Sequence, residues 1–140
     1  MKNDPKSTSG WLVKTEPSTY SFERLQEEKK ARWDGVANAV AQKHLRAMKK
    51  GDAVLVYHTG DVKAAVGLAR VASDPYPDPA DAKFSVVDLE AVRPLARSVT
   101  LAQVKADPAF AEFLLVRIGR LSVMPVAAEY WARLMRLAGE

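Results

Sequence analysis

The 140-residue sequence contains no cysteine, only two histidines, and no apolar run long enough to cross a lipid bilayer. The absence of cysteine excludes disulfides, thiolate nucleophiles and cysteine-ligated zinc sites. No spacing resembles a metal motif such as HExxH. The opening residues 1–10, MKNDPKSTSG, lack the apolar stretch of a secretory signal and are predicted to form a disordered leader. We therefore expect a cytoplasmic protein without a metal or another cofactor.

Recognisable catalytic patterns are missing as well. No glycine-rich phosphate loop follows a predicted strand, and no serine lies in a nucleophile-elbow pattern. Glu16 is a lone carboxylate after the first predicted strand, and the sequence names no second acid or base to work with it. We expect a protein without catalytic activity, and the alternative from this class is an enzyme that uses Glu16 as a general base.

The composition that remains is ordinary for a soluble domain with a mild basic excess. Hydrophobic residues make up 48% of the chain, charged residues 27%, and the formal net charge is +4. A chain of this length is expected to form one domain, over residues 11–138, and to behave as a monomer. The positive charge is compatible with a nucleic acid partner, although many proteins without one are equally basic.

Hydrophobic patterns predict an α+β chain without the regular alternation of a doubly wound sheet. Strands are expected over residues 11–15, 53–58, 64–73 and 84–92, with a further short strand within 117–126. Helices are expected over residues 22–30, 39–50 and 127–138, with short helical pieces after Thr100 and Asp107. This order suits a small, curved, mostly antiparallel β-barrel with helices packed at its mouth and side.

Local signals mark where the helices should begin. Ser21 and Asn38 are suitable N-cap residues, and Thr100 with Gln103 three residues later forms a capping box. The segment 74–81 carries three prolines and is predicted to be a loop.

The helix predicted over residues 39–50 carries an apolar face and a basic face. Its apolar positions are Val40, Ala41, His44, Leu45 and Met48. Lys43, Arg46 and Lys50 share another face and are predicted to contact a phosphate backbone. A basic face beside the mouth of a ligand pocket would imply a polymer, whereas a face on the opposite side would favour a free ligand.

Aromatic and basic residues are interleaved along the chain. A nucleic acid base has a flat π surface with hydrogen-bonding edges, so its site needs a stacking ring surrounded by polar groups. Trp33 is a candidate ring because it precedes the turn signal Asp34-Gly35, and a purely structural role at the end of the barrel is an equal alternative. His44 is interpreted as a core or boundary histidine, and His58 as either a pocket residue or a structural one.

Five segments carry a family resemblance. WLVKTEPSTYSFERL, WDGVAN, VLVYHTG, VGLARV and VRIGRLSVMPV follow one another in this order. Together they resemble the EVE-domain family over about residues 11–138, a family with the PUA-like fold that is similar to the YTH readers of methylated adenine in RNA. The resemblance implies an α+β, PUA-like small β-barrel with flanking helices. It also implies a non-catalytic pocket for a modified base flipped out of DNA or RNA, and the alternative is a binder of a free nucleoside or another small planar ligand.

The resemblance also implies which residues form the pocket, and Trp33 matches a stacking tryptophan of the YTH readers. The implied ligand-binding residues are Lys14, Thr15, Glu16, Trp33, Asn38, Tyr57, His58, Arg117, Arg120 and Ser122. The chain departs from the family pattern over residues 37–43, ANAVAQK, where many relatives carry two arginines and a tyrosine. The base that the pocket accepts is therefore not specified by the resemblance.

Overall fold

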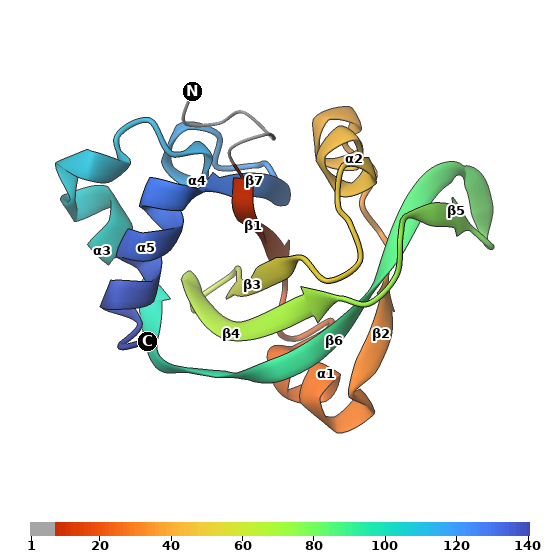
Figure 1. Cartoon of the computed structure of the whole chain (residues 1–140), viewed down its shortest axis with the longest axis horizontal. Helices are drawn as coiled ribbons and strands as arrows, with labels where there is room; N and C mark the ends of the chain where they lie inside the picture. Colours follow the sequence, from red (N-terminus) through yellow and green to blue (C-terminus); the bar gives the residue numbers. More distant parts are fainter. Residues whose placement is uncertain (1–7) are drawn as a thin grey trace.

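The computed structural model describes residues 8–140, which form one curved sheet flanked by helices (Figure 1). The elements are β1 (Thr8–Thr15), α1 (Phe22–Glu28), β2 (Lys30–Trp33), α2 (Ala39–Arg46), β3 (Ala53–His58), β4 (Ala64–Val71), β5 (Tyr76–Asp78), β6 (Asp81–Thr100), α3 (Leu101–Ala106), the 3-10 helix η2 (Pro108–Phe110), α4 (Leu114–Arg117), β7 (Val123–Ala127) and α5 (Ala128–Leu137). The predicted α+β class is confirmed.

The first strand begins earlier than the sequence predicted. Residues 8–10 were expected in the leader, yet they belong to β1, and the remainder of the predicted leader lies outside the described residues. Gly10 faces the indole of Trp131 in α5, where an added Cβ would lie 2.4 Å from a ring carbon. The absence of a side chain at Gly10 therefore lets α5 pack directly on the start of β1.

The strands follow the order β2-β6-β4-β3-β1-β7, and β5 pairs with β6. Strands β1 and β3 are parallel, and every other pair is antiparallel. The long strand β6 bends where its register against β4 shifts, and Figure 1 shows it curving along one side of the sheet. No backbone pairing joins the edge strands β2 and β7 within residues 8–140. The mostly antiparallel sheet is therefore curled like a barrel but open along one seam.

The core lies between the curled sheet and the helices that cover it. Strands β3 and β7 are almost entirely buried, and β1 is buried over residues 10–13. Helices α3, α4 and α5 gather at one end of the sheet (Figure 1), where the rings of Phe110, Phe113 and Tyr130 pack against one another. No helix within residues 8–140 is long and apolar enough to cross a membrane.

Strand β2 was missed by the sequence analysis, which continued the preceding helix to residue 30. Helix α1 ends at Glu28, and Lys29 adopts a positive φ of 68°, which turns the chain back. Residues 30–33 then pair with residues 87–90 of β6. This correction matters for function because β2 carries Arg32 and Trp33.

Helix α2 also differs from the prediction. It ends at Arg46 rather than at residue 50, and Val40, expected on the apolar face, is 50% exposed. The side chain of Gln42 is buried instead, so the inward face is rotated from the predicted one. His44 is half-buried, as a boundary residue would be. The proline-rich segment 74–81, predicted to be a loop, contains the short strand β5.

Candidate functional site

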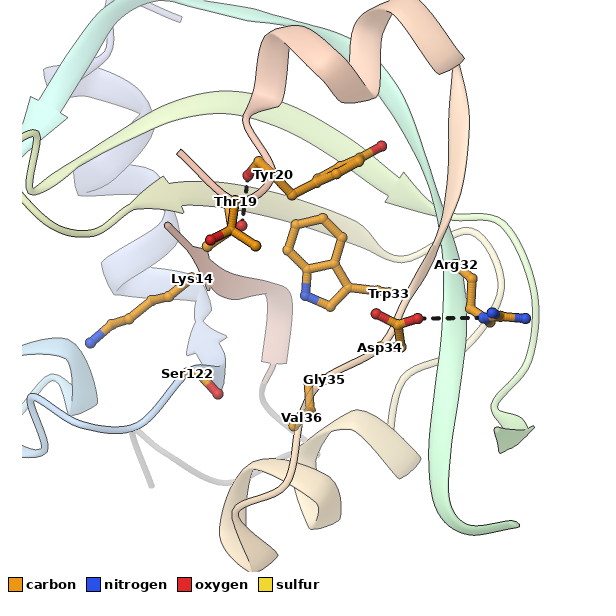
Figure 2. Close-up of a pocket in the computed structure, with 10 residues that line it drawn as sticks. Lys14, Thr19, Tyr20, Arg32, Trp33, Asp34, Gly35, Val36 and Ser122 are labelled. Atoms are coloured by element: carbon orange, nitrogen blue, oxygen red, sulfur yellow. Dashed lines mark hydrogen bonds and ion pairs between the residues drawn. The ribbon is translucent and has the colours of Figure 1, made fainter. Parts of the chain in front are cut away.

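A cavity of about 410 Å³ opens near the seam between the edge strands of the sheet (Figure 2). Its wall comes from four stretches of chain that are far apart in the sequence. They are the end of β1 with Lys14 and Thr15, the following loop with Thr19 and Tyr20, the end of β2 with the turn over residues 32–36, and Ser122 just before β7. The volume is in the range of small-molecule binding pockets.

Trp33 forms an aromatic wall of this cavity. Its side chain is only 7% exposed, and the ring of Tyr20 meets it edge-on with a centroid separation of 6.0 Å. The indole N–H has no hydrogen-bond partner among the described residues, yet it is not among the fully enclosed polar atoms. In Figure 2 this nitrogen is turned toward the side of the cavity where Ser122 lies. The ring thus combines a flat apolar surface with a free donor.

Lys14 and Thr15 line the cavity because β1 ends there. The backbone N–H of Lys14 donates to the Ser122 carbonyl at 2.9 Å, which fixes β1 beside the start of β7. The Lys14 ammonium donates to the Gly119 carbonyl at 2.8 Å, and burial lowers its pKa. The hydroxyl of Thr15 donates to the Tyr20 carbonyl at 2.7 Å and closes the intervening loop. These two residues therefore both build the wall and hold its loops in place.

Further polar groups surround the opening. The hydroxyls of Thr19 and Ser122 have no hydrogen-bond partner within residues 8–140, so they are available to a ligand. Asp34 forms an ion pair with Arg32 at 3.6 Å, shown as a dashed line in Figure 2. An aromatic wall with hydroxyl, ammonium and carboxylate groups around it suits a planar ligand with polar edges. The described residues contain no cluster of three or more histidine or acidic side chains that could hold a metal ion.

The structure brings four of the predicted ligand-binding residues to this cavity, namely Lys14, Thr15, Trp33 and Ser122. The other six do not line it. Glu16 is exposed, and its carboxylate accepts hydrogen bonds from the backbone N–H and the hydroxyl of Ser18 at 3.1 and 3.0 Å. Of the polar run at the end of β1, only Lys14 and Thr15 therefore line the cavity, whereas Glu16 holds the loop that follows.

Asn38 and His58 have structural contacts that account for their positions. The Asn38 side-chain oxygen accepts the backbone N–H groups of Val40 and Ala41 and so caps α2. His58 is buried, and its Nε2 accepts the N–H of Phe22 at 3.0 Å, at the start of α1. Burial lowers the pKa of His58, which favours the neutral ring that this contact requires. The structural interpretation of His58 is the one that fits.

The remaining predicted residues also lie outside the wall of this cavity. Tyr57 lines a second, smaller cavity. Arg117 is exposed and forms an ion pair with Glu112. Arg120 is exposed, follows Gly119, and forms no hydrogen bond or ion pair within residues 8–140. Arg120 thus follows the residue whose carbonyl binds Lys14, without being part of the cavity wall.

Six wall residues were not predicted as ligand-binding, namely Thr19, Tyr20, Arg32, Asp34, Gly35 and Val36. Three of them belong to the Trp-Asp-Gly-Val motif, so the motif itself was the available signal. Thr19 and Tyr20 belong to the first family segment, WLVKTEPSTYSFERL, which was their available signal. Arg32 could be found only through the pairing of β2 with β6.

The predicted basic face of α2 does not form part of the cavity wall. Helix α2 begins only three residues after Val36, so its first turn is close to the cavity. Arg46, however, donates to the Ser85 hydroxyl at 3.0 Å and to the Lys83 carbonyl at 3.3 Å, both in β6. This side of the helix is directed toward β6, and Lys43 and Lys50 are exposed.

Comparison with known proteins finds relatives by sequence and by fold. The EVE domain profile matches residues 9–137. Mouse thymocyte nuclear protein 1 is 32% identical over an alignment that covers 92% of this chain and 74% of the mouse protein. The solution structure of Rpa0253 from Rhodopseudomonas palustris is 42% identical, with a TM-score of 0.89 over 94% of this chain and 93% of that chain.

A structure of the human THYN1 protein in complex with 5-methylcytosine-containing DNA is 27% identical, with a TM-score of 0.85 over 95% of this chain and 99% of that one. A more distant likeness concerns the fold alone. ASCH from Zymomonas mobilis is 12% identical, with a TM-score of 0.59 over 96% of each chain.

Proposed function

The chain belongs to the EVE domain family, as its motifs predicted, and we propose that its cavity holds a modified base flipped out of a nucleic acid strand. The observation that carries this proposal is the position and the free N–H of the Trp33 indole. Its ring lines the cavity while its indole N–H has no partner within residues 8–140. A stacking surface and an unused donor are what a flipped base with hydrogen-bonding edges would require.

The remaining wall supports the same ligand. The free hydroxyls of Thr19 and Ser122 can each donate or accept, so they can match the edge of a base. The human THYN1 relative, with its 5-methylcytosine DNA, makes 5-methylcytosine the first base to test. A cavity of about 410 Å³ is large enough for a base and part of its sugar.

We propose binding without catalysis. Asp34 is the carboxylate in the cavity wall, and it is paired with Arg32. Glu16, the alternative general base, lies outside the wall and accepts two hydrogen bonds from Ser18. A hydrolytic site needs an acid or base that is free to reach the substrate, and neither carboxylate meets this requirement.

One observation favours a second candidate, a binder of a free nucleoside. Arg46 is directed toward β6 rather than the cavity, so the predicted phosphate-contacting face is not continuous with the wall. The two candidates differ in one respect, because only a polymer reader should bind an oligonucleotide more tightly than the free nucleoside.

The test is a titration of the purified protein with labelled DNA and RNA oligonucleotides that each carry one modified base, beginning with 5-methylcytosine. Each oligonucleotide is paired with its unmodified counterpart and with the free modified nucleoside. We expect one modified oligonucleotide to bind at least about tenfold more tightly than its unmodified form, a difference of about 1.4 kcal/mol. Equal affinity across all pairs would refute base recognition, and a nucleoside that binds as tightly as its oligonucleotide would favour the second candidate.

A matched pair of tryptophan variants tests whether Trp33 recognises the modified base. Trp33→Phe keeps a ring in the cavity but removes its N–H, so it should reduce the preference for the modified base. Trp131→Phe makes the same chemical change in α5, where the indole packs over Gly10 and lines none of the described cavities. The control variant should bind like the wild type.

A further inference from the structure

A second cavity of about 200 Å³ lies on the other side of the Lys14 side chain. Lys14 lines both cavities, so the two hollows adjoin along this one residue. The second wall also contains Tyr57 at the end of β3, Lys63 from the turn before β4, and Lys105 from α3. Its apolar part includes Leu101 and Leu115.

Tyr57 provides an unused polar group in this cavity. Its side chain is only 3% exposed, yet its hydroxyl has no hydrogen-bond partner among the described residues. The Lys14 ammonium lies 5.6 Å from the centre of the tyrosine ring. Burial raises the pKa of Tyr57, so the hydroxyl remains a donor at neutral pH. The hydroxyl is not among the fully enclosed polar atoms, so a ligand in the cavity can reach it.

Three lysines line this cavity together with Tyr57, and its wall contains no carboxylate. Lys63 and Lys105 form no ion pair within residues 8–140, and the Lys63 carbonyl accepts the Leu101 N–H at 2.8 Å, which holds the turn against α3. The acidic residues nearest in the chain, Glu16 and Asp61, do not line the cavity. The Glu16 carboxylate lies next to Thr59 and Gly60, two residues of this wall, and accepts hydrogen bonds from Ser18 and Thr59. The wall therefore offers several donors and net positive charge, which suits an anion.

We propose that this second cavity is a phosphate site, in which Lys14, Lys63, Lys105 and the Tyr57 hydroxyl bind the phosphate oxygens. Ammonium and hydroxyl donors are the groups that proteins use to hold phosphate oxygens. On the proposed function, the occupant is a backbone phosphate beside the flipped nucleotide, because Lys14 separates the base cavity from the phosphate cavity. Free inorganic phosphate has the same chemistry and is the alternative occupant of the site.

The first experiment tests the site itself. Inorganic phosphate is titrated into ¹⁵N-labelled protein, and amide shifts are followed for the wild type, Tyr57→Phe, and the double variant Lys63→Gln/Lys105→Gln. The control is Lys30→Gln/Arg136→Gln, which also removes two positive charges, at exposed positions that line neither cavity. We expect saturable shifts around Tyr57 and Lys63 in the wild type and the control. The double variant should bind at least about fivefold more weakly, Tyr57→Phe should also weaken binding, and unchanged melting temperatures would exclude a folding defect.

The second experiment identifies the source of the phosphate. The affinity for the preferred oligonucleotide is measured at several salt concentrations. The slope of log K against log salt should be shallower by about one in the double variant than in its control. The ratio of affinities for modified and unmodified oligonucleotides should not change, because it depends on the base cavity. Phosphate-induced shifts with an unchanged slope would support the site with free phosphate as its ligand. No saturable shift, or equal shifts in all variants, would overturn the phosphate site, whatever the outcome for base recognition.

Discussion

Gln42 and Ser85 exchange two hydrogen bonds although they are 43 residues apart in the sequence. The Gln42 amide donates to the Ser85 carbonyl at 2.9 Å and accepts the Ser85 N–H at 2.8 Å. The same amide also donates to the Val36 carbonyl at 2.7 Å. The buried side chain therefore acts like one more peptide group beside β6, and it fixes the turn that forms part of the cavity wall.

Replacing Gln42 by Leu should destabilise the fold. The change leaves the Ser85 N–H and carbonyl and the Val36 carbonyl without this partner, so we expect a loss of about 2–4 kcal/mol in the free energy of unfolding. Urea denaturation measures the loss. Gln26→Leu is the matched control, because Gln26 is exposed on α1 and should change stability by less than about 0.5 kcal/mol. Equal stabilities of the two variants would show that the Gln42 contacts contribute little.

Trp33→Ala should lower both stability and binding. The sequence-based hypothesis placed Trp33 either at a pocket rim or in a structural position, whereas the structure gives it a buried ring that also lines the cavity. We expect a loss of about 3 kcal/mol in the free energy of unfolding, because a large buried ring is removed. Binding to the preferred oligonucleotide should weaken by about 1–3 kcal/mol, the usual contribution of a base–aromatic contact.

Thermal melting and titration below the melting temperature separate these two effects of Trp33→Ala. Affinity per folded molecule that remains equal to that of the wild type would make Trp33 a purely structural residue. It would also remove the main support for the base pocket.

Lys43 in α2 and Lys50, which follows the helix, should affect affinity without affecting base choice. Lys43→Gln/Lys50→Gln should weaken binding to modified and unmodified oligonucleotides by the same factor, because phosphate contacts carry no sequence information. The salt slope should fall by up to about two. Arg46 is left unchanged because its guanidinium also bonds to β6. If affinity and slope match those of Lys30→Gln/Arg136→Gln, Lys43 and Lys50 do not contact the phosphate backbone, and the free-nucleoside candidate gains support.

His58 should make stability depend on pH below neutrality. Burial lowers the pKa of His58 from its ordinary value of 6.5, and its Nε2 must be unprotonated to accept the Phe22 N–H. As the pH falls below about 6.5, the unfolded chain binds this proton before the folded chain does. The free energy of unfolding should therefore decrease, by at most about 1.4 kcal/mol per pH unit for this one group.

Urea denaturation at pH 7.5, 6.5 and 5.5 measures this dependence. His58→Gln keeps an acceptor but cannot titrate, so its stability should change less over this range than that of the wild type. His44→Gln is the comparison, because burial and the nearby Lys43 also lower the pKa of the half-buried His44. The same pH dependence in His58→Gln and in the wild type would contradict the assignment.

Features that depend on neighbouring residues were predictable from the sequence. Ser21 and Asn38 cap their helices as expected, Thr100 and Gln103 form the predicted capping box, and β3 has the predicted bounds. Each of these signals involves residues within a few positions of one another, so no knowledge of the tertiary structure is needed.

Features that depend on distant pairing were not predictable in the same way. Residues 30–33 follow a helix-forming stretch, and they become a strand only because β6 is available to pair with them. Gln42 was not singled out because its partner Ser85 is 43 residues away. The family motifs located Lys14, Thr15, Trp33 and Ser122 at the cavity, but they could not show that Asn38 caps α2 or that His58 accepts the Phe22 N–H.

The open seam between β2 and β7 has a consequence for how the ligand specificity of this protein can evolve. The hydrogen-bonded ladders lie within the sheet, whereas most of the cavity wall lies at strand ends and in turns. Substitutions at Thr19 or Ser122 can therefore alter which ligand fits while no ladder hydrogen bond is lost. Ligand choice and folding stability are largely uncoupled at these positions, so a few substitutions can redirect this scaffold to another ligand without first weakening it.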